Sequence, residues 1–422
     1  MKKIVSVLLL TSCLSLPCQA DLYQSLRQVY ETNPEILVQR QVVQSAGADV
    51  SLSKTGWQPS VGVSGGLAQT RTKLAGETYH ETQKQIGVSA SQNVFNGFAT
   101  TADIKSAKAL LRAEEANLYA TEQDVFLEAI QAYINVLNAK EVLRLNKNNE
   151  KLLYEYYDLY VQKEKVGVLT KTDVAQAAAR LEQAKYQVID AQAQYDNAIE
   201  TFKRIYGQTE QHYTDIHLKR LNGYFPKSIQ MAETEALKKH PSILAMKARQ
   251  TASEEKITVA KQTYRPSVDV KASATKYNDI PIVDEITDNR IGVYLTVPLY
   301  DRGVAFAATR KAKTNASAIR EQGIHVQRLV LEKLRQAWNL YEAQKAAVQS
   351  AEIRIRASRL ALDGVQDEQE RGRRTVLDVL NAEQELLDAQ VAFIQAKHRQ
   401  ISSYFAVLSG TGMLTAEHLG LK

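Results

Sequence analysis

The chain has 422 residues, of which 24% are charged and 44% are hydrophobic, and its formal net charge at pH 7 is only +6. Positive and negative residues are interspersed, so the composition gives no support to a nucleic-acid-binding protein. Beyond the first 20 residues no segment approaches the run of about 18 apolar residues that a transmembrane helix needs.

Residues 1–20 have the features of a secretory signal peptide. Two lysines begin the segment, an apolar stretch too short to span a bilayer follows, and small residues end it at Ala20. Both cysteines of the sequence, Cys13 and Cys18, lie inside this segment. We therefore expect an exported mature chain that has no disulfides and is held together by packing or assembly.

The remainder of the sequence repeats one plan twice, with offsets of 207 (240 − 33) and 205 (372 − 167) residues. Several matching pairs in the same order indicate an internal duplication. We assign residues 21–225 to a first structural repeat and residues 226–422 to a second. The matching pairs include Asn33-Pro34 and His240-Pro241, Pro59-Ser60 and Pro266-Ser267, and Gly167 and Gly372.

Each repeat is predicted to begin with a helix of about 25 residues, which one proline opens and a later proline ends. A β-hairpin follows at about 60–95 and again at about 267–300, because apolar residues alternate there with a period of two. We expect the polar segments at roughly 71–85 and 276–290 to connect the two strands of each hairpin.

Long helices are predicted after each hairpin, at 98–165 and 303–370. The first of these segments contains no proline or glycine, and at ~1.5 Å per residue it gives a helix on the order of 100 Å long. Further helices are predicted at 170–206 and 375–409, where large apolar residues and alanines each recur every seven residues. Such heptads are also typical of a soluble coiled coil or helix bundle.

The strands and the long helices together favour a duct. Four strands cannot close a barrel alone, and open strand edges cannot lie in lipid. The smallest known outer-membrane barrels have about 8 strands, so closure needs several copies, and three chains give twelve strands. We therefore predict a mainly α protein with a β-barrel part that continues into a helical tube. The alternative is a periplasmic coiled-coil structural or adaptor protein that never enters the membrane.

The order of the motifs resembles the TolC family of outer-membrane efflux and secretion channels. The resemblance implies a homotrimer, a twelve-stranded barrel in outer-membrane lipid and an α-helical periplasmic tunnel. It also implies a passive exit duct for a tripartite efflux pump or a type I secretion system, with a periplasmic adaptor and an inner-membrane transporter as partners and without a cofactor. The residues that carry it are Asn33-Pro34, Gln58-Pro59-Ser60 and Phe95-Asn96-Gly97, their repeats, and the run from Gly372 to Ala382.

By the same resemblance, a gate lies at the periplasmic helix tips. Asp378 matches an aspartate that forms a ring in the pore, and Arg374 matches an arginine that latches to Thr172 and Asp173. Asn381 stands where some members carry a second aspartate, so this chain has a neutral amide at the position of their second acidic ring. The alternative for Asp378 is an ordinary solvated residue.

The tips also resemble the surface that contacts the adaptor. The alternative is that their glycines only make the turns. Gln369 replaces a tyrosine of the family's latch, and no residue selects a drug, a metal or a protein as cargo. The residues of the expected adaptor contact are Val166, Gly167, Val168, Gly372 and Arg373.

The sequence gives little support to an enzyme. Ser64 lies within Gly-x-Ser-x-Gly, but the alternation continues through it, whereas a hydrolase nucleophile stands between a strand and a helix. His212 and His217 lack a third ligand at a spacing typical of a metal site. We therefore predict no catalytic residue, cofactor or metal.

Overall fold

The computed structural model describes residues 22–74, 76–207, 213–216, 223–280 and 283–421. The predicted signal peptide at 1–20 lies outside the described residues. The chain divides into two compact units. Unit 1 comprises Met1–Pro34, Glu122–Ile229 and Leu334–Lys422, and unit 2 comprises Glu35–Thr121 and Gln230–Lys333.

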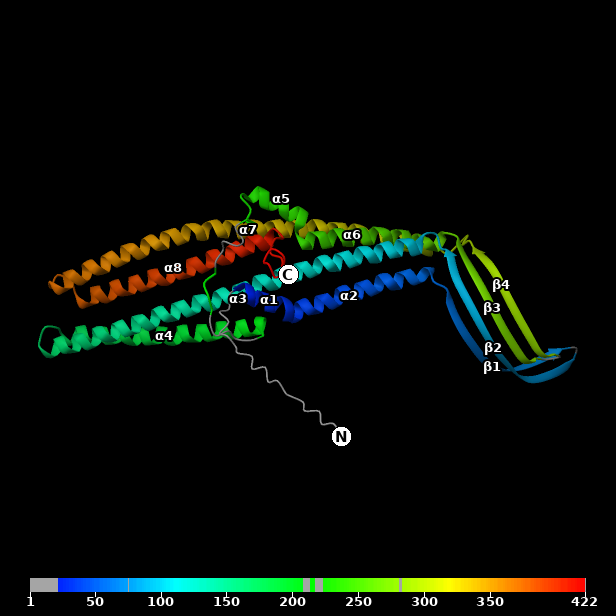
Figure 1. Ribbon diagram of the computed structural model, residues 1–422, viewed down its shortest axis with the longest axis horizontal. Helices are drawn as coiled ribbons and strands as arrows, with labels where there is room; N and C mark the ends of the chain where they lie inside the picture. Colours follow the sequence, from blue (N-terminus) through cyan, green and yellow to red (C-terminus); the bar gives the residue numbers. More distant parts are fainter. Residues whose placement is uncertain (1–21, 75, 208–212, 217–222, 281–282, 422) are drawn as a thin grey trace, which may run out of the picture. The chain divides into compact units, whose positions relative to one another are not determined.

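Unit 2 contains one antiparallel sheet with the strand order β1-β2-β3-β4 (Figure 1). The four predicted strands are thus confirmed, and they form two hairpins that pair through β2 and β3. The strand bounds are Ser60–Leu74, Glu77–Phe95, Ser267–Ile280 and Val283–Thr296.

The predicted connections at 71–85 and 276–290 were wrong, because the strands are longer than the apolar alternation indicates. The ladders continue to the pairs Leu74–Glu77 and Ile280–Val283. Polar residues fill these extensions, among them threonines and tyrosines, which favour strands without adding an apolar period.

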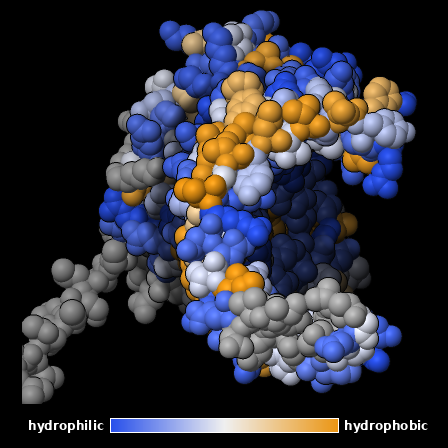
Figure 2. Space-filling model, turned by 90° about the vertical axis from the view of Figure 1, so that its right-hand side faces the viewer, coloured by the Kyte–Doolittle hydropathy of each residue, from blue (hydrophilic) through white to orange (hydrophobic). Residues whose placement is uncertain are grey.

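The two faces of the sheet differ in chemistry. Cross-strand partners share a face, and the register pairs Val63 with Val88 and Val270 with Val293. The opposite face is polar or small, as in the Gly62–Ser89–Ser273 row. Figure 2 shows apolar residues gathered in a band on the surface that it views. The large exposed members of the apolar face are Val61, Val63, Leu67, Ile86, Val88, Ile291, Val293 and Leu295.

The turn from β2 to the next helix and the turn from β4 to the next helix contain the same type of hydrogen bond. Asn96 Oδ1 accepts from Thr100 N at 3.2 Å, and 205 residues later (301 − 96) Asp301 Oδ2 accepts from Ala305 N at 2.5 Å. Each side chain therefore caps the helix that follows its strand. These helices are α3 (Ala99–Lys165) and α7 (Val304–Glu370), each 67 residues long without a break.

Shorter helices complete unit 2. They are α2 (Pro34–Lys54), η1 (Thr55–Trp57), α5 (Ile229–Lys239), α6 (Pro241–Ala260) and η3 (Lys261–Tyr264). His240 caps α6 by accepting a hydrogen bond from Ser242 N at 3.3 Å. Burial, and then the positive charge of Lys333, lower the pKa of His240 to about 4, so its ring stays neutral and able to accept this bond at neutral pH.

Unit 1 contains α1 (Leu22–Thr32), α4 (Lys171–Tyr206), α8 (Val376–Gly410) and the adjoining parts of α3 and α7. The sequence did not reveal α1. A cluster of aromatic rings packs α4 against α3, with Phe202 stacked on Tyr206 at 4.0 Å and close to Tyr133 and Tyr213. Among the described residues no helix combines the length and the apolar character that crossing a membrane requires.

Candidate functional site

Two helical hairpins of unit 1 end in nearly identical turns. The first hairpin joins α3 to α4 through Gly167, and the second joins α7 to α8 through Gly372. Both glycines have positive φ, at 79° and 72°, which a residue with a side chain adopts only with strain. The glycines therefore make the turns, which is compatible both with an adaptor contact and with a purely structural role.

The turns also expose apolar side chains. Val166 and Val168, on either side of Gly167, are 75% and 68% exposed. Isolated exposed valines are ordinary on a protein surface, but two at the end of a projecting turn are suited to a contact with another protein. In the second hairpin the flanking positions are Arg371 and Arg373, so the two tips differ in chemistry.

Asp173 and Asp378 occupy the same local position, three residues into a helix. Asp173 Oδ2 accepts from Thr170 N at 2.9 Å, and Thr170 Oγ1 accepts from Asp173 N at 3.2 Å. Thr375 and Asp378 form the same reciprocal pair with the same distances. Each aspartate therefore completes a capping box that satisfies backbone donors at the start of α4 or α8.

The capping contacts also fix the charge of Asp378. The backbone donor of Thr375, then its hydroxyl and then the nearby guanidinium of Arg374 hold the pKa of Asp378 below its ordinary value of 3.8. Because the pKa of Asp378 is lower in the folded protein, its ionised carboxylate stabilises the fold above pH 3.8. This stabilisation is lost as the pH falls through the lowered pKa. Asp378 is consequently a carboxylate throughout the neutral range.

Replacing Thr170 by alanine is expected to cost about 1 kcal/mol and to fray the first turn of α4, because one side-chain cap is removed. Hydrogen exchange of the amides that follow residue 170 measures this fraying. Thr172→Ala is the matched control, since Thr172 is an exposed threonine two residues away that is not the N-cap. Equal exchange in the two variants would contradict the assignment of the cap.

The expected latch from Arg374 to the first tip is not made within this chain. Arg374 Nε instead donates to Glu368 Oε2 at 2.9 Å, which joins α7 to the start of α8 within the second hairpin. This bond, followed by the charges of Glu368 and Asp378, raises the pKa of Arg374. Thr172 and Asp173 lie on the other hairpin, where Asp173 bonds to Thr170.

A different arginine crosses between the hairpins. Arg180 Nη2, on α4, donates to Asn381 Oδ1, on α8, at 2.6 Å. The bond is exposed, with Asn381 at the surface and Arg180 half-buried, so it competes with water and contributes little net stability. Asn381, which the family resemblance places beside a pore, thus accepts a bond from the first hairpin.

A partly buried polar cluster also joins the hairpins, between their tips and the rest of unit 1. Tyr156 Oη of α3 donates to Glu383 Oε1 of α8 at 2.9 Å. Gln366 Nε2 of α7 donates to Tyr156 Oη at 2.9 Å and to Glu383 Oε1 at 3.2 Å. Glu383 is only 7% exposed, although it is ionisable.

An apolar layer surrounds this polar cluster. It draws residues from α3, α4 and α8, so the bundle is well packed at this level. Its buried members are Leu153, Tyr160, Ala177, Leu181, Ala184, Val376 and Leu380. Burial, and then the charge of Glu383, raise the pKa of Tyr156 well above its ordinary value, which keeps its hydroxyl protonated and able to donate.

Sequence reasoning missed Glu383, although its position gave a signal. Val379, Leu380 and Leu387 are buried at spacings of four, three and four residues from it, so a carboxylate interrupts an apolar stripe. Charged residues are almost never buried unless they are paired, which predicts a partner on a facing helix. The sequence did not indicate which helix supplies that partner.

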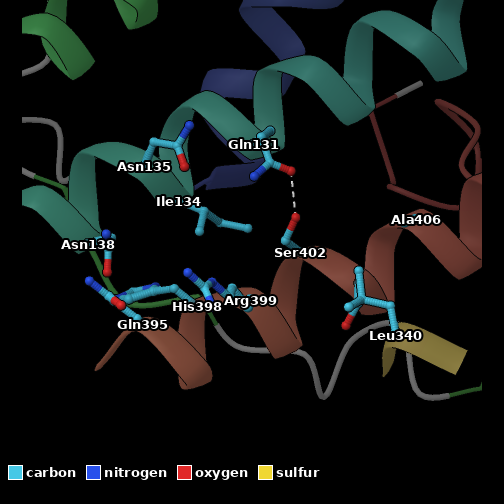
Figure 3. Close-up of a pocket in the computed structure, with 11 residues that line it drawn as sticks. Gln131, Ile134, Asn135, Asn138, Leu340, Gln395, His398, Arg399, Ser402 and Ala406 are labelled. Atoms are coloured by element: carbon cyan, nitrogen blue, oxygen red, sulfur yellow. Dashed lines mark hydrogen bonds between the residues drawn. The ribbon is translucent and has the colours of Figure 1, made fainter. Parts of the chain in front are cut away.

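A hollow of about 560 Å³ lies between α3 and α8 (Figure 3). Side chains of Gln131, Asn135 and Asn138 face Gln395 and Ser402 across it, and Ser402 Oγ donates to Gln131 Oε1. Carboxamides and hydroxyls offer hydrogen bonds, so these side chains are suited to contact with water or polar solutes.

His398 borders the same hollow and is only 4% exposed. Its Nε2 lies 3.5 Å from Glu141 Oε2 of α3. The proximity of His398 lowers the pKa of Glu141 despite the partial burial of that carboxyl group. The pair adds a polar contact between α3 and α8.

The structure does not provide the surroundings that the two enzyme-like motifs of the sequence would need, as far as these motifs lie in the described residues. Strand β1 continues past Ser64 to Leu74, so no helix follows this serine as a nucleophile elbow requires. His212 and His217 lie outside the described residues. Within the described ranges no group of three or more His, Cys, Asp or Glu side chains is placed to hold a metal ion.

Comparison with known proteins identifies what this arrangement is similar to. The family model described as "Outer membrane efflux protein" matches residues 25–208 and 234–412, so it matches the chain twice. Outer membrane efflux protein BepC of Brucella suis biovar 1 (strain 1330) is 30% identical over 427 residues, which cover 100% of this chain and 92% of that protein.

Two further proteins are similar to this chain over most of its length. Outer membrane protein TolC of Escherichia coli (strain K12) is 22% identical over 445 residues, covering 99% of this chain and 88% of that protein. The crystal structure of the Campylobacter jejuni CmeC outer membrane channel superposes with a TM-score of 0.83 at 18% identity and covers 93% of this chain and 86% of that one. At this identity the structural likeness shows the fold alone.

Proposed function

The chain belongs to the family of outer membrane efflux proteins, and on this premise we propose that three copies assemble so that their sheets close one twelve-stranded barrel. Each chain supplies four strands in the order β1-β2-β3-β4, and its described sheet leaves β1 and β4 as edges. Edges of this kind cannot lie in lipid, so neighbouring copies must pair them.

The protein is an outer-membrane channel that extends into the periplasm and serves efflux or type I secretion. It conducts substrates passively to the exterior, and its family consists of channel proteins. The observation that carries this function is the four-stranded sheet with an exposed apolar face, joined to long helices. A periplasmic adaptor that never enters the membrane has no use for such a face, so that alternative is set aside.

The periplasmic entrance is proposed to lie at the two hairpin tips. The exposed Val166 and Val168 support a contact with a periplasmic adaptor that links the channel to an inner-membrane transporter. Gly167 and Gly372 shape the tips, and Arg373 gives the second tip a positive charge. The adaptor would therefore bind the two tips through different chemistry.

The same proposal places the pore constriction just above the tips. Three copies of the Asp378 carboxylate around a narrow axis attract cations. Arg374, Thr172 and Asp173 stay candidates for contacts between chains, because their bonds within one chain leave further donor and acceptor positions. Asn381 would contribute a neutral polar group to the constriction.

We expect the purified protein to crosslink as a trimer in mild detergent and to form cation-preferring channels in planar bilayers. Asp378→Asn should lower the cation preference and weaken block by multivalent cations from the periplasmic side, while the amide oxygen can still accept the capping bonds.

Asp388→Asn is the matched control, since Asp388 is an exposed carboxylate on the same helix, bonded to Gln384. A soluble monomer without channel activity would overturn the proposed assembly. Unaltered cation block in Asp378→Asn would remove Asp378 from the pore.

A further inference from the structure

The apolar face of the sheet becomes basic towards the two hairpin turns. Residues two apart in a strand share a face, so Lys276 lies on the face of Ala274, and Lys84 lies on the face of Val88. Each lysine is further from the helices than its apolar neighbour. The described lysines and arginines in this part of the face are Arg71, Lys73, Lys84 and Lys276, and all four side chains are exposed.

Charge is divided unevenly between the two faces in this part of the sheet. On the basic face the one described carboxylate is Glu285, whose Oε1 lies 2.8 Å from Lys276 Nζ. The described carboxylates of Glu77 and Asp288 belong to the opposite face. With histidine counted as neutral, the described side chains of the basic face carry a net charge of +3 (4 − 1), which favours an anionic partner.

The basic residues begin where one membrane crossing ends. A transmembrane strand needs about 9–11 residues, and β4 supplies ten from Thr296 back to Thr287 (296 − 287 + 1). Thr287 pairs with Lys276, and the row that contains Lys84 lies two residues further on. Since the helices extend into the periplasm from the opposite ends of the strands, the basic residues lie at the outer leaflet.

We propose that the basic face, defined by Arg71, Lys73, Lys84 and Lys276, binds the phosphate groups of a glycolipid in the outer leaflet. This proposal rests on the assembled barrel proposed above, which turns the apolar face towards lipid. The acyl chains contact the apolar rows, and the phosphates meet the cations at the edge of these rows. A phosphorylated lipid matches both parts of the face, whereas a soluble anion matches only the basic part.

Two of the lysines are placed to hold one phosphate. Lys84 pairs with Asn278, and Lys276 lies two residues from Asn278 along β3, so the two lysines are diagonal neighbours. Such positions lie about 7–8 Å apart, and a lysine carries its three donors on a flexible four-carbon stem. Both ammonium groups can therefore reach oxygens of the same phosphate. Arg71 and Lys73, two residues apart on β1, form a second pair on this face.

The ion pair between Lys276 and Glu285 is compatible with this contact. Their side chains are 46% and 51% exposed, so the pair contributes little and exchanges readily. The ammonium group of Lys276 also has three donors, and it can bind Glu285 and a phosphate oxygen together. The carboxylate thus keeps the lysine on the basic face without occupying all of its donors.

The first test replaces both diagonal lysines by glutamine. Binding of fluorescent lipopolysaccharide to the purified trimer in mild detergent should weaken about 30-fold in Lys84→Gln/Lys276→Gln, because each lysine near an anionic surface contributes about fivefold, or about 1 kcal/mol. Lys84→Arg/Lys276→Arg should retain the affinity, since both charges stay. Lys271→Gln/Arg290→Gln is the matched control, which removes two positive charges from the opposite face and should leave the affinity unchanged.

The second test identifies which part of the ligand is bound. The unaltered trimer should bind dephosphorylated lipopolysaccharide about as weakly as Lys84→Gln/Lys276→Gln binds the phosphorylated form. Equal affinity of the unaltered trimer for the two glycolipids would overturn the phosphate contact. Displacement of the phosphorylated lipid by an equal concentration of inorganic phosphate would reveal a site for free anions and overturn the lipid contact.

Separate readouts distinguish this proposal from the proposed channel. Failure of the unaltered protein to crosslink as a trimer and to conduct would overturn the channel assembly and the lipid contact that rests on it. If trimers formed and conducted, but Lys84→Gln/Lys276→Gln bound lipopolysaccharide as tightly as Lys271→Gln/Arg290→Gln, the phosphate site alone would be overturned and the channel would stand.

Discussion

Replacing Ile291 by arginine is expected to prevent insertion into the outer membrane. Ile291 lies on the apolar face of β4 and is 83% exposed in the single chain, so in water an arginine there would be harmless. In lipid, an arginine at the middle of a barrel strand costs about 2–4 kcal/mol, and three copies give roughly 6–12 kcal/mol per trimer. Fractionation of membranes and the yield of detergent-resistant trimer measure the loss.

Ser89→Arg supplies the matched control on the other face of the sheet. Ser89 is exposed and pairs with Gly62 and Ser273, so an arginine there meets small neighbours on the polar face. We expect normal insertion with altered ion selectivity, because that face would line the lumen. Equal insertion of Ile291→Arg and Ser89→Arg would show that the apolar face does not meet lipid.

The two faces of the sheet could be predicted from the sequence because side chains along a strand point alternately to opposite faces. Two positions on, as from Val61 to Val63, the chain returns to the same face, so the sequence shows which residues share a surface. The ends of the strands were not readable. Threonine and lysine near Leu74 continue the ladder as well as valine does, but they give no apolar signal.

The long helices were predictable for a complementary reason. An absence of proline and glycine over dozens of residues, with heptads in the helices that follow, leaves few alternatives to α3 and α4. Helix α1 was hidden because its 11 residues carry only about three turns of pattern next to the predicted signal peptide. Its burial comes from packing against other parts of unit 1, which no local pattern encodes.

The tips illustrate how far local rules reach into the candidate site. Glycines at 167 and 372 predicted the turns, and the spacing of Thr170 to Asp173 and of Thr375 to Asp378 matches a capping box that the sequence already displayed. Local sequence patterns did not predict which side chains would contact one another from different segments of the chain. Arg374 reaches Glu368, six residues earlier, only because the turn folds α8 back along α7.

The polar cluster of Tyr156, Gln366 and Glu383 could be found only in the tertiary structure. A carboxylate on the apolar stripe of α8 predicts that some donor must face it, but Tyr156 is 227 residues away in the chain. The polar contacts at Gln131 and Ser402 and at Glu141 and His398 follow the same pattern along α3 and α8. Pairings of this kind depend on the rotation of each long helix, which an average heptad pattern does not fix.

The second large effect is expected for Phe202→Ala at the other end of the first hairpin. Phe202 is fully buried, stacked on Tyr206 at 4.0 Å and edge-on to Tyr213 at 5.3 Å. Removing a buried phenylalanine side chain costs about 3–5 kcal/mol, because the cavity is only partly refilled. The midpoint of urea unfolding, followed by circular dichroism, should fall.

Tyr186→Ala is the control, because Tyr186 is an aromatic residue of the same helix that is 69% exposed. We expect it to leave amide exchange around residues 199–206 unchanged, whereas Phe202→Ala should accelerate exchange there by two orders of magnitude or more, since about 1.4 kcal/mol corresponds to a factor of ten. A gate between hairpins works only if each hairpin moves as a stiff body, and the ring cluster anchors α4 to α3 opposite the tip. Phe202→Ala should therefore make conductance noisy as well as lower stability. Steady gating in a Phe202→Ala channel would show that stiffness resides elsewhere along the 36 residues of α4.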